Sequence, residues 1–377
     1  MSKTTWTSLL TASLMTLMAD THAATLLVGS YTDGQSQGIY RYSFDTRSGQ
    51  IDATPQQVIQ SVSPSWLVLS ADQRQLFAVN ETAQGQVSSF AVDAKGVIKP
   101  LNQVPSQGDE PTHASLSHDQ RYLFVANYAV APDPGGSLVA LPVTRDGKLK
   151  GVVQQLRHAP SKVNAERQAG AHVHSLVLSP NGRHLYASDL GADKVFIYRY
   201  DGASTAQPLS PAIPAFVSLP PGSGPRHLLF DAKGRHAFLT LEMSGEVVMF
   251  DVQEPALIER QRLPLSESQE PAAKASAALH LSADGRFLYV SNRGTANQIV
   301  VYAVGQDDGQ LTLLQRRSTD GDHPREFALD PSGNFLLVAN QKSNQVVVIR
   351  RDPRSGKLGE TLQRLPQAAP SDLKFIE

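Results

Sequence analysis

Residues 225–242 read PRHLLFDAKGRHAFLTLE, which is a short apolar stretch, a polar turn and a second apolar stretch. Turn-forming residues between two apolar runs are typical of a β-hairpin. Five other segments of 18 residues align with this one without gaps: 64–81, 111–128, 173–190, 276–293 and 324–341. The repeat predicts one structural unit that is used along the whole chain.

A third apolar segment, in most cases rich in Val, Ile, Phe and Tyr, follows each hairpin. These segments are residues 87–92, 137–143, 194–200, 246–252, 298–304 and 345–350. A fourth, less regular segment precedes the next hairpin, and the units recur about every 50 residues. Four strands at this spacing are typical of one blade of a β-propeller.

Both ends of the chain carry fragments of the same unit. Residues 25–31 match a second strand, residues 39–44 match a third strand, and residues 370–376 match a first strand. We therefore predict an all-β, seven-bladed propeller whose last blade is closed by the N- and C-terminal strands, with the C-terminal strand innermost. Such closure leaves no free sheet edge between blades. Six blades with two loose ends are the alternative.

Composition excludes several classes of protein. The 377 residues include 34 Lys and Arg against 35 Asp and Glu, and a net charge of -1 gives no field that would attract nucleic acid or an anionic membrane. The chain has no Cys, which rules out disulfides, thiolate metal ligands and a Cys nucleophile. We expect a small-molecule ligand, no nucleic acid and no obligate protein partner.

The first 23 residues differ from the rest. Lys3 is followed by an apolar stretch from Trp6 to Met18 and by Thr21-His22-Ala23, as in a secretory signal peptide. This stretch of about 13 residues is shorter than the ~20 that a membrane span needs. We predict a cleavable signal peptide at 1–23, a single propeller domain at 24–377 and a periplasmic location. An uncleaved membrane anchor is the alternative.

The gap-free alignment allows equivalent positions to be read as rings around the central channel. Residues that open the first strands and residues that close the second strands should meet at one mouth of this channel, because the links that join them lie on one face. The closing ring is Tyr31, Glu81, Tyr128, Leu190, Glu242, Arg293 and Gln341. The opening ring is Ser65, Thr112, His174, Arg226, Ala277, Arg325 and Ser371.

Charged residues, His and amides gather in these rings and beside them, as expected for function on a rigid scaffold. The catalytic candidates are His174, Glu242, Arg226 and Arg293. The substrate-binding candidates are His172, His113, His227, Glu81, Asn127, Tyr128, Asp189, Asn292 and Arg325. A structural salt bridge would also explain a pair such as Arg226 and Glu242, and burial between blades would explain some of the His residues.

Two of these histidines invite a comparison with metal sites. His172 and His174 flank Val173, so both side chains should point to the same side of an extended strand. Imidazoles are common metal ligands, but no third ligand stands at a definite spacing. We therefore predict no metal and no cofactor, and we expect His174 to act as a general base or to bind the substrate by a hydrogen bond.

One interval is longer than the others. Asn127 and Asp189 are 62 residues apart, and the excess lies in residues 157–171, a polar segment that enters the mouth just before His172. This segment is either a lid over the mouth or a surface insertion.

Several of these motifs resemble the seven-bladed propeller lactonases, the family of propeller-type bacterial 6-phosphogluconolactonases and fungal carboxy-muconate lactonizing enzymes. The resemblance runs from about Leu27 to the C-terminus. Its motifs are Gly222-Ser-Gly-Pro-Arg-His227, Ala171-His-Val-His174, Ser291-Asn-Arg293, Ala126-Asn-Tyr128 and Glu242 at a strand end. It implies a metal-independent site formed by His174 (or His172), Glu242, Arg226 and Arg293.

Within this family the chain looks closest to a periplasmic gluconolactonase, because the predicted signal peptide sets it apart from cytosolic members that act on phosphosugars. The resemblance and the location together imply hydrolysis of D-glucono-1,5-lactone to gluconate, with His174 or Glu242 as the general base. The alternatives are 6-phosphogluconolactonase activity, a cycloisomerase-type reaction and a propeller that only binds a partner, since fold does not imply function.

Overall fold

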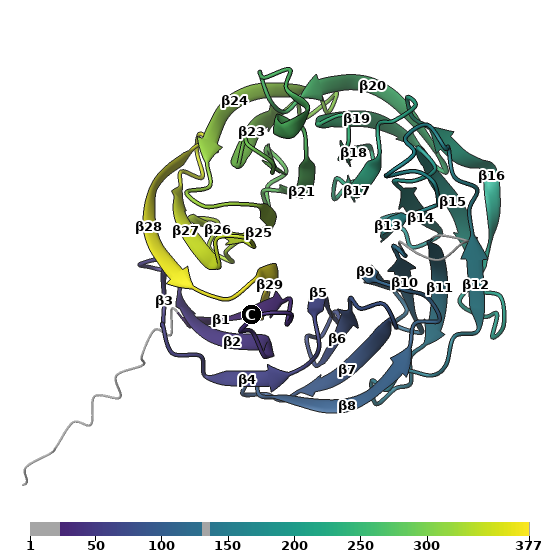
Figure 1. The fold of residues 1–377 in the computed structure, drawn as a ribbon, viewed down its shortest axis with the longest axis horizontal. Coiled ribbons are helices and arrows are strands. Elements are labelled where there is room, and N and C mark those ends of the chain that lie inside the picture. Colours follow the sequence, from purple (N-terminus) through teal and green to yellow (C-terminus); the bar gives the residue numbers. More distant parts are fainter. Residues whose placement is uncertain (1–22, 130–135, 377) are drawn as a thin grey trace, which may run out of the picture.

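The computed structural model describes residues 23–129 and 136–376. Seven antiparallel sheets stand around a central channel, with one edge of each sheet facing the axis (Figure 1). The seven-bladed propeller predicted from the repeat is therefore confirmed. Within the described residues, no helix is long and apolar enough to cross a bilayer.

Six blades are built from consecutive strands, ordered from the axis outward. The first two are β5 (Pro64–Leu69), β6 (Gln75–Asn80), β7 (Gln86–Val92), β8 (Ile98–Pro105), and β9 (Pro111–Leu116), β10 (Tyr122–Asn127), β11 (Ser137–Pro142), β12 (Gln154–Arg157). The next two are β13 (Val173–Leu178), β14 (His184–Asp189), β15 (Lys194–Tyr200), β16 (Leu209–Ser218), and β17 (Pro225–Phe230), β18 (His236–Leu241), β19 (Glu246–Gln253), β20 (Ala256–Pro264). The last two are β21 (Ser276–Leu281), β22 (Phe287–Asn292), β23 (Gln298–Val304), β24 (Leu311–Ser318), and β25 (Pro324–Leu329), β26 (Phe335–Asn340), β27 (Gln345–Arg351), β28 (Leu358–Pro366).

The seventh blade joins the two ends of the chain. Its strands are β29 (Pro370–Ile376), β1 (Ala23–Ser30), β2 (Gly38–Asp45), β3 (Gln50–Ile51) and β4 (Gln57–Gln60). The innermost strand β29 pairs antiparallel with β1, as predicted. The predicted signal peptide lies outside the described residues except for Ala23, which begins β1 opposite Asp45.

A hydrophobic cluster fills each of the seven interfaces between blades. Apolar side chains alternate along the strands, so each sheet offers an apolar surface to both neighbours. The closing blade is packed in the same way as the others, since Phe44 of β2 and Phe335 of β26 meet edge to face at 5.9 Å. Burial of one large apolar side chain contributes about 2 kcal/mol, so these clusters rather than disulfides hold the ring.

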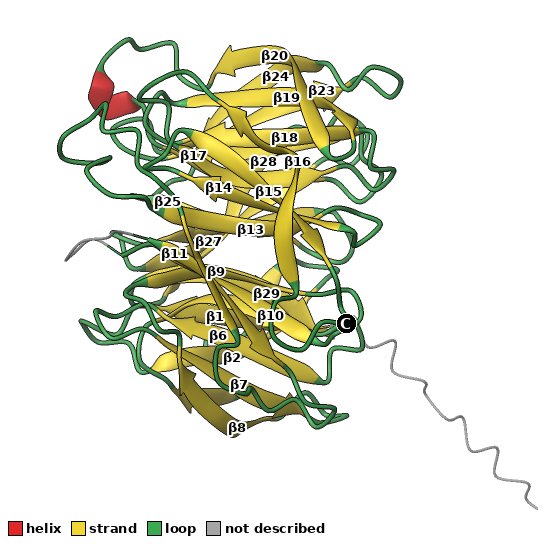
Figure 2. Ribbon diagram, turned by 90° about the vertical axis from the view of Figure 1, so that its right-hand side faces the viewer, coloured by secondary structure: helices red, strands yellow, loops and turns green. Residues whose placement is uncertain are grey.

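The two faces of the ring differ in what joins the strands. The 3₁₀ turn η1 (Pro271–Ala273) belongs to a link between blades and lies at one edge of the ring in side view, while the C-terminus lies at the other edge (Figure 2). The edge with η1 is the mouth predicted from the rings. The turns between the first and second strands of each blade lie on the opposite face.

Candidate active site

One backbone hydrogen bond recurs in all seven blades and fixes the height of the mouth residues. The residue that closes each second strand donates its N–H to the carbonyl oxygen two residues before the opening residue, at 2.7 to 3.1 Å. The donor and acceptor pairs are Tyr31 and Ala369, Glu81 and Ser63, Tyr128 and Glu110, Leu190 and His172, Glu242 and Gly224, Arg293 and Ala275, and Gln341 and His323. A repeat without gaps keeps this bond in every blade, which explains why the rings could be read from the sequence.

The loop before Arg226 is held by a carboxylate from the neighbouring blade. Asp193 accepts the N–H groups of Gly222 at 2.8 Å and of Gly224 at 2.9 Å. Gly224 has a φ of 65°, and a Cβ there would lie 2.7 Å from Cγ of Met243. This position therefore requires glycine. The glycines of the Gly-Ser-Gly-Pro-Arg-His motif thus set the backbone from which Arg226 enters the mouth.

Glu242 is the centre of the largest ion-pair cluster at the mouth. Its Oε2 lies 3.0 Å from Nε of Arg226 and 2.9 Å from Nη2 of Arg293, and its Oε1 lies 2.7 Å from Nη2 of Arg167. Burial raises the pKa of the Glu242 carboxyl, but Arg293 and Arg226 lower it more and hold the pKa well below its usual range. The carboxyl is therefore ionised at neutral pH and neutralises guanidiniums that would otherwise be buried without a partner.

His174 lies beside this cluster, in contact with Tyr128 and His227. Its ring stands nearly perpendicular to the ring of Tyr128 and steeply inclined to that of His227, with centroids 5.6 Å and 5.3 Å away. Burial, helped by the charge of Arg226, holds the pKa of His174 well below its usual range. Within the described residues its Nδ1 makes no hydrogen bond. His174 is therefore a neutral imidazole with an unpaired nitrogen.

A second ion-pair cluster lies across the channel. Nη2 of Arg325 lies 3.3 Å from Oε2 of Glu81 and its guanidinium lies over the ring of Tyr31. The hydroxyl groups of Tyr31 and Ser65 also donate to Glu81. This cluster offers several hydrogen-bonding groups on the side of the channel opposite the Glu242 cluster.

The floor between the two clusters is tightly packed. His227 and His113 pack on each other, with ring centroids 5.5 Å apart, and both contact Trp66. Burial, followed by the charge of Lys374, lowers the pKa of His113 to about 3. The hollow that remains above this floor has a volume of only about 10 Å³, roughly the space of one water molecule. It is lined by Ser65, Trp66, Thr112, His174, Arg226, His227, Arg325, Glu326 and Ser371.

His172 does not share the position of His174. Its ring stacks on Tyr128 at 4.6 Å and its Nδ1 lies 2.9 Å from the backbone oxygen of Tyr128. The register between β13 and β14 shifts between Val173 and Ser175. The His172 ring stacks on the ring of Tyr128, whereas the His174 ring stands nearly perpendicular to it. Within the described residues, no group of three or more His, Asp or Glu side chains is arranged to bind a metal ion.

Three predicted substrate contacts hold loops instead. Asn127, Asp189 and Asn292 are fully buried, one position before the closing ring. The bonds run from Nδ2 of Asn127 to the Ser106 carbonyl, from the His172 N–H to Oδ1 of Asp189, and from Nδ2 of Asn292 to the Ala273 carbonyl. These bonds hold the links between blades on the face of the mouth, and successive side chains on a strand point to opposite sides, so the closing residues that follow them point the other way. Their contact with a substrate stays a prediction.

The chain resembles known proteins over almost its whole length. The family model "Lactonase, 7-bladed beta-propeller" matches residues 25–375. The chain belongs to this lactonase family. A 6-phosphogluconolactonase of Formosa agariphila is 34% identical over 91% of this chain and 95% of its own length, and one of Bacillus subtilis is 30% identical over 93% and 97%. The structure of the Pseudomonas aeruginosa periplasmic gluconolactonase PpgL is 49% identical and covers 94% of this chain and 99% of its own, with a TM-score of 0.91.

Two residues at the mouth of this lactonase-family propeller were not predicted. Arg167 comes from the inserted segment 157–171, and its contact with Glu242 places part of that segment over the mouth, as the lid interpretation expects. The backbone carbonyl of His323 accepts the N–H of Gln341 in the recurring bond, and its side-chain Nε2 lies 3.4 Å from Nη1 of Arg293. Burial and the charge of Arg293 lower the pKa of His323 to about 3. The repeat could have placed His323, which lies two residues before Arg325, but it has no position for Arg167.

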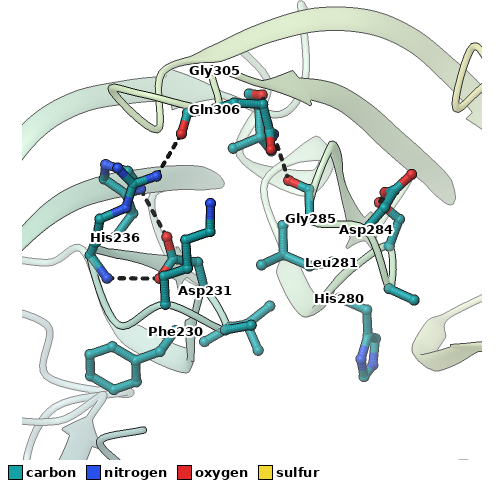
Figure 3. A pocket seen from close by; sticks show the side chains of 16 residues that line it. Phe230, Asp231, His236, His280, Leu281, Asp284, Gly285, Gly305 and Gln306 are labelled. Atoms are coloured by element: carbon teal, nitrogen blue, oxygen red, sulfur yellow. Dashed lines mark hydrogen bonds and ion pairs between the residues drawn. The ribbon is translucent and has the colours of Figure 1, made fainter.

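The opposite face of this propeller carries a larger hollow between two blades, with a volume of about 490 Å³. Figure 3 shows its polar side chains, which come from the hairpin turns: Nδ1 of His236 lies 3.0 Å from Oδ2 of Asp231 and the Arg235 guanidinium donates to the Gln306 carbonyl. The first contact lies within one turn, and the second joins turns of two neighbouring blades. No ion-pair cluster comparable to that of Glu242 lines this hollow within the described residues.

Proposed function

We propose that the chain hydrolyses a sugar lactone, D-glucono-1,5-lactone, to gluconate in the periplasm. The observation that carries this proposal is the placement of Arg226 and Arg293 on one carboxylate oxygen of Glu242, next to the neutral imidazole of His174. This arrangement offers a base and two fixed cations in one place. Membership of the lactonase family and the similarity to PpgL support the substrate and the location, together with the predicted signal peptide.

His174 is better suited than Glu242 to be the general base. Both carboxylate oxygens of Glu242 are paired with guanidiniums, so neither is free to take a proton from water. His174 is neutral and has an unpaired nitrogen. It takes one proton from water as the water oxygen attacks the lactone carbonyl, and Glu242 stabilises the imidazolium that forms. Such general base catalysis contributes ~10²–10⁴-fold to a rate.

Arg226 and Arg293 then stabilise the negative charge that develops on the carbonyl oxygen. Burial and the nearby Arg293 lower the pKa of Arg226 to about 9, so it remains charged at neutral pH. When the tetrahedral intermediate collapses, the bond to the ring oxygen breaks and this oxygen takes the proton from His174. The new carboxylic acid releases its own proton to water, which leaves gluconate.

The hydroxyl groups of the sugar need polar partners on the solvent side of the hollow, because the hollow itself is smaller than a sugar ring. Glu81 and Tyr128 are partly exposed at the mouth and Arg325 lines the hollow, and these three are the candidates among the predicted binding residues. His113 and His227 form the floor and shape the site from below.

The test is hydrolysis of glucono-1,5-lactone by the purified protein in EDTA, with spontaneous hydrolysis subtracted. Arg226→Ala and Glu242→Ala should each lower kcat/KM by about a hundredfold, as expected for loss of a fixed charged donor or of the group that holds it. Gln306→Ala, on the opposite face, serves as the matched control and should not change the rate. Wild-type rates in both mouth variants would refute the assignment.

A carboxylated lactone, or a cycloisomerase reaction that forms one, is the second candidate. The surplus of cations favours it, because Arg226, Arg293 and Arg167 surround the single carboxylate of Glu242, and guanidiniums bind carboxylates in a bidentate manner. A parallel assay with neutral and carboxylated lactones separates the two reactions.

A further inference from the structure

Arg167 reaches the mouth from a loop that is itself well anchored. The neighbouring Gln168 is fully buried, and its Nε2 donates to the carbonyl of Leu190 at 2.9 Å. The Gln168 N–H donates to the Asn164 carbonyl at 2.8 Å, and its own carbonyl accepts the N–H of Lys162. The backbone at Arg167 is therefore fixed, and its long side chain is the part that can change partners.

The side chain of Arg167 is the exposed one of the three arginines around Glu242. Its exposed fraction is 44%, against 2% for Arg226 and 8% for Arg293. Its Nη2 bridges Oε1 of Glu242 and the hydroxyl of Tyr128, at 2.7 Å and 3.2 Å. Because Arg226 and Arg293 already share the other oxygen of Glu242, Arg167 contributes positive charge beyond what this carboxylate needs.

Arg167 and Arg226 bind the two oxygens of the same carboxylate, so a ligand that reaches Arg226 comes close to Arg167. The hollow that Arg226 lines is about 10 Å³, which suffices for one water and excludes a sugar ring. A lactone whose carbonyl reaches Arg226 must therefore keep the rest of its ring on the solvent side, at the level of Arg167 and Tyr128. Whatever substituent the ring carries there comes close to a solvent-accessible guanidinium.

We propose that Arg167 sets the preference of the site between neutral and anionic lactones, by exchanging Glu242 for a phosphate or carboxylate group on the ligand. A guanidinium binds either group through two parallel hydrogen bonds, and the exchange leaves Glu242 paired with its two buried arginines. This inference rests on the proposed lactonase function and adds a specificity-determining residue to it.

The experiment compares kcat/KM for glucono-1,5-lactone and for its 6-phosphate in the mature protein. Arg167→Gln should lower the ratio of phosphorylated to neutral activity by about fivefold, the upper end for one partly exposed ion pair. Arg167→Lys should lower this ratio less than Arg167→Gln does, because lysine keeps the positive charge but lacks the planar guanidinium that makes two parallel hydrogen bonds. In the wild type, added salt should lower the same ratio.

Arg157→Gln is the matched control, because Arg157 is an exposed cation at the start of the same segment. It should leave both rates unchanged, and thermal melting shows whether each variant folds. An equal loss on both substrates in Arg167→Gln, or an unchanged ratio, would overturn the inference. A wild-type protein that hydrolyses neither lactone would instead overturn the proposed function.

Discussion

The two faces of the propeller are built from the same repeat but use it differently. On the face away from the mouth, the turns repeat one local contact between a Ser hydroxyl and a carboxylate or amide oxygen two residues away. The pairs are Ser70 and Asp72, Ser117 and Asp119, Ser179 and Asn181, Ser282 and Asp284, and Ser332 and Asp330. At the mouth, equivalent positions carry different residues, and these residues contact each other across blades.

This difference separates structural from functional polar groups better than the size of a hollow does. The hollow in Figure 3 is far larger than the one at the mouth, yet its polar groups make single contacts, such as His236 with Asp231 of the same turn and Arg235 with the Gln306 carbonyl of the next blade. At the mouth, Glu242 binds arginines from its own blade, the next blade and the inserted segment. Residues that break the repeat and meet from separate blades are the ones to test for function.

The sharpest test of this contrast replaces His174. His174→Gln keeps a polar side chain but removes the base, and we expect kcat/KM for glucono-1,5-lactone to fall by about a hundredfold or more. His236, which binds Asp231 on the opposite face, provides the comparison, and His236→Gln should retain the wild-type rate. Equal losses in the two variants would mean that the faces do not differ in function.

A smaller effect is expected from carboxylates that only hold turns. Asp193→Asn leaves an amide facing the N–H groups of Gly222 and Gly224, which disturbs the loop that positions Arg226. We expect kcat to fall by about tenfold with little change in KM, as for a lost interaction that acts in the transition state. Asp284→Asn alters a turn on the opposite face and should leave kcat unchanged. A rise in KM alone would argue against a positioning role for Asp193.

The smallest effect concerns stability in acid. The pKa of buried His113 is lowered to about 3, so between about pH 6.5 and pH 3 the unfolded chain binds the proton that the folded chain excludes. The free energy of unfolding therefore falls as the pH falls below about 6.5, by up to ~1.4 kcal/mol per pH unit. His113→Gln should reduce the loss of Tm between pH 7 and pH 5 by about 1–3 °C.

The control for this measurement is His118→Gln, which changes an exposed histidine in a turn of the opposite face. It should leave the pH dependence of Tm as in the wild type. If both variants show the wild-type slope, the burial of His113 does not contribute to acid sensitivity.

The blades and the rings could be predicted because both depend on spacing. The third strands expected at 194–200 and 298–304 are β15 and β23, since apolar runs bounded by turn residues leave little choice of structure. The mouth positions followed because one backbone bond repeats in every blade. Register alone was therefore enough to place Glu242, Arg226 and Arg293 at the mouth.

The direction of a side chain at a ring position and the contacts of the inserted segment 157–171 could not be predicted in the same way. A ring position gives height along the channel, but Asn127 and Tyr128 are neighbours that point to opposite sides of one strand, and only Tyr128 lies at the mouth. Arg167 belongs to no repeat, so no register places it. Its partners depend on how a loop folds over the ring, which is tertiary information.

The inner strand β29 gives the last residues of the chain a part in the opening itself, because Ser371 lines the hollow and Asp372 accepts the N–H of Leu67. During synthesis, chains fold from the N-terminal end as it emerges, yet this hollow can only be completed by β29, which leaves the ribosome after the six consecutive blades. Arg226 and Glu242 would thus be in place as a pair long before the enclosure around them exists. Removal of the final eight residues should therefore yield an open arc of six finished blades, in which the first strands of the chain have lost their inner neighbour.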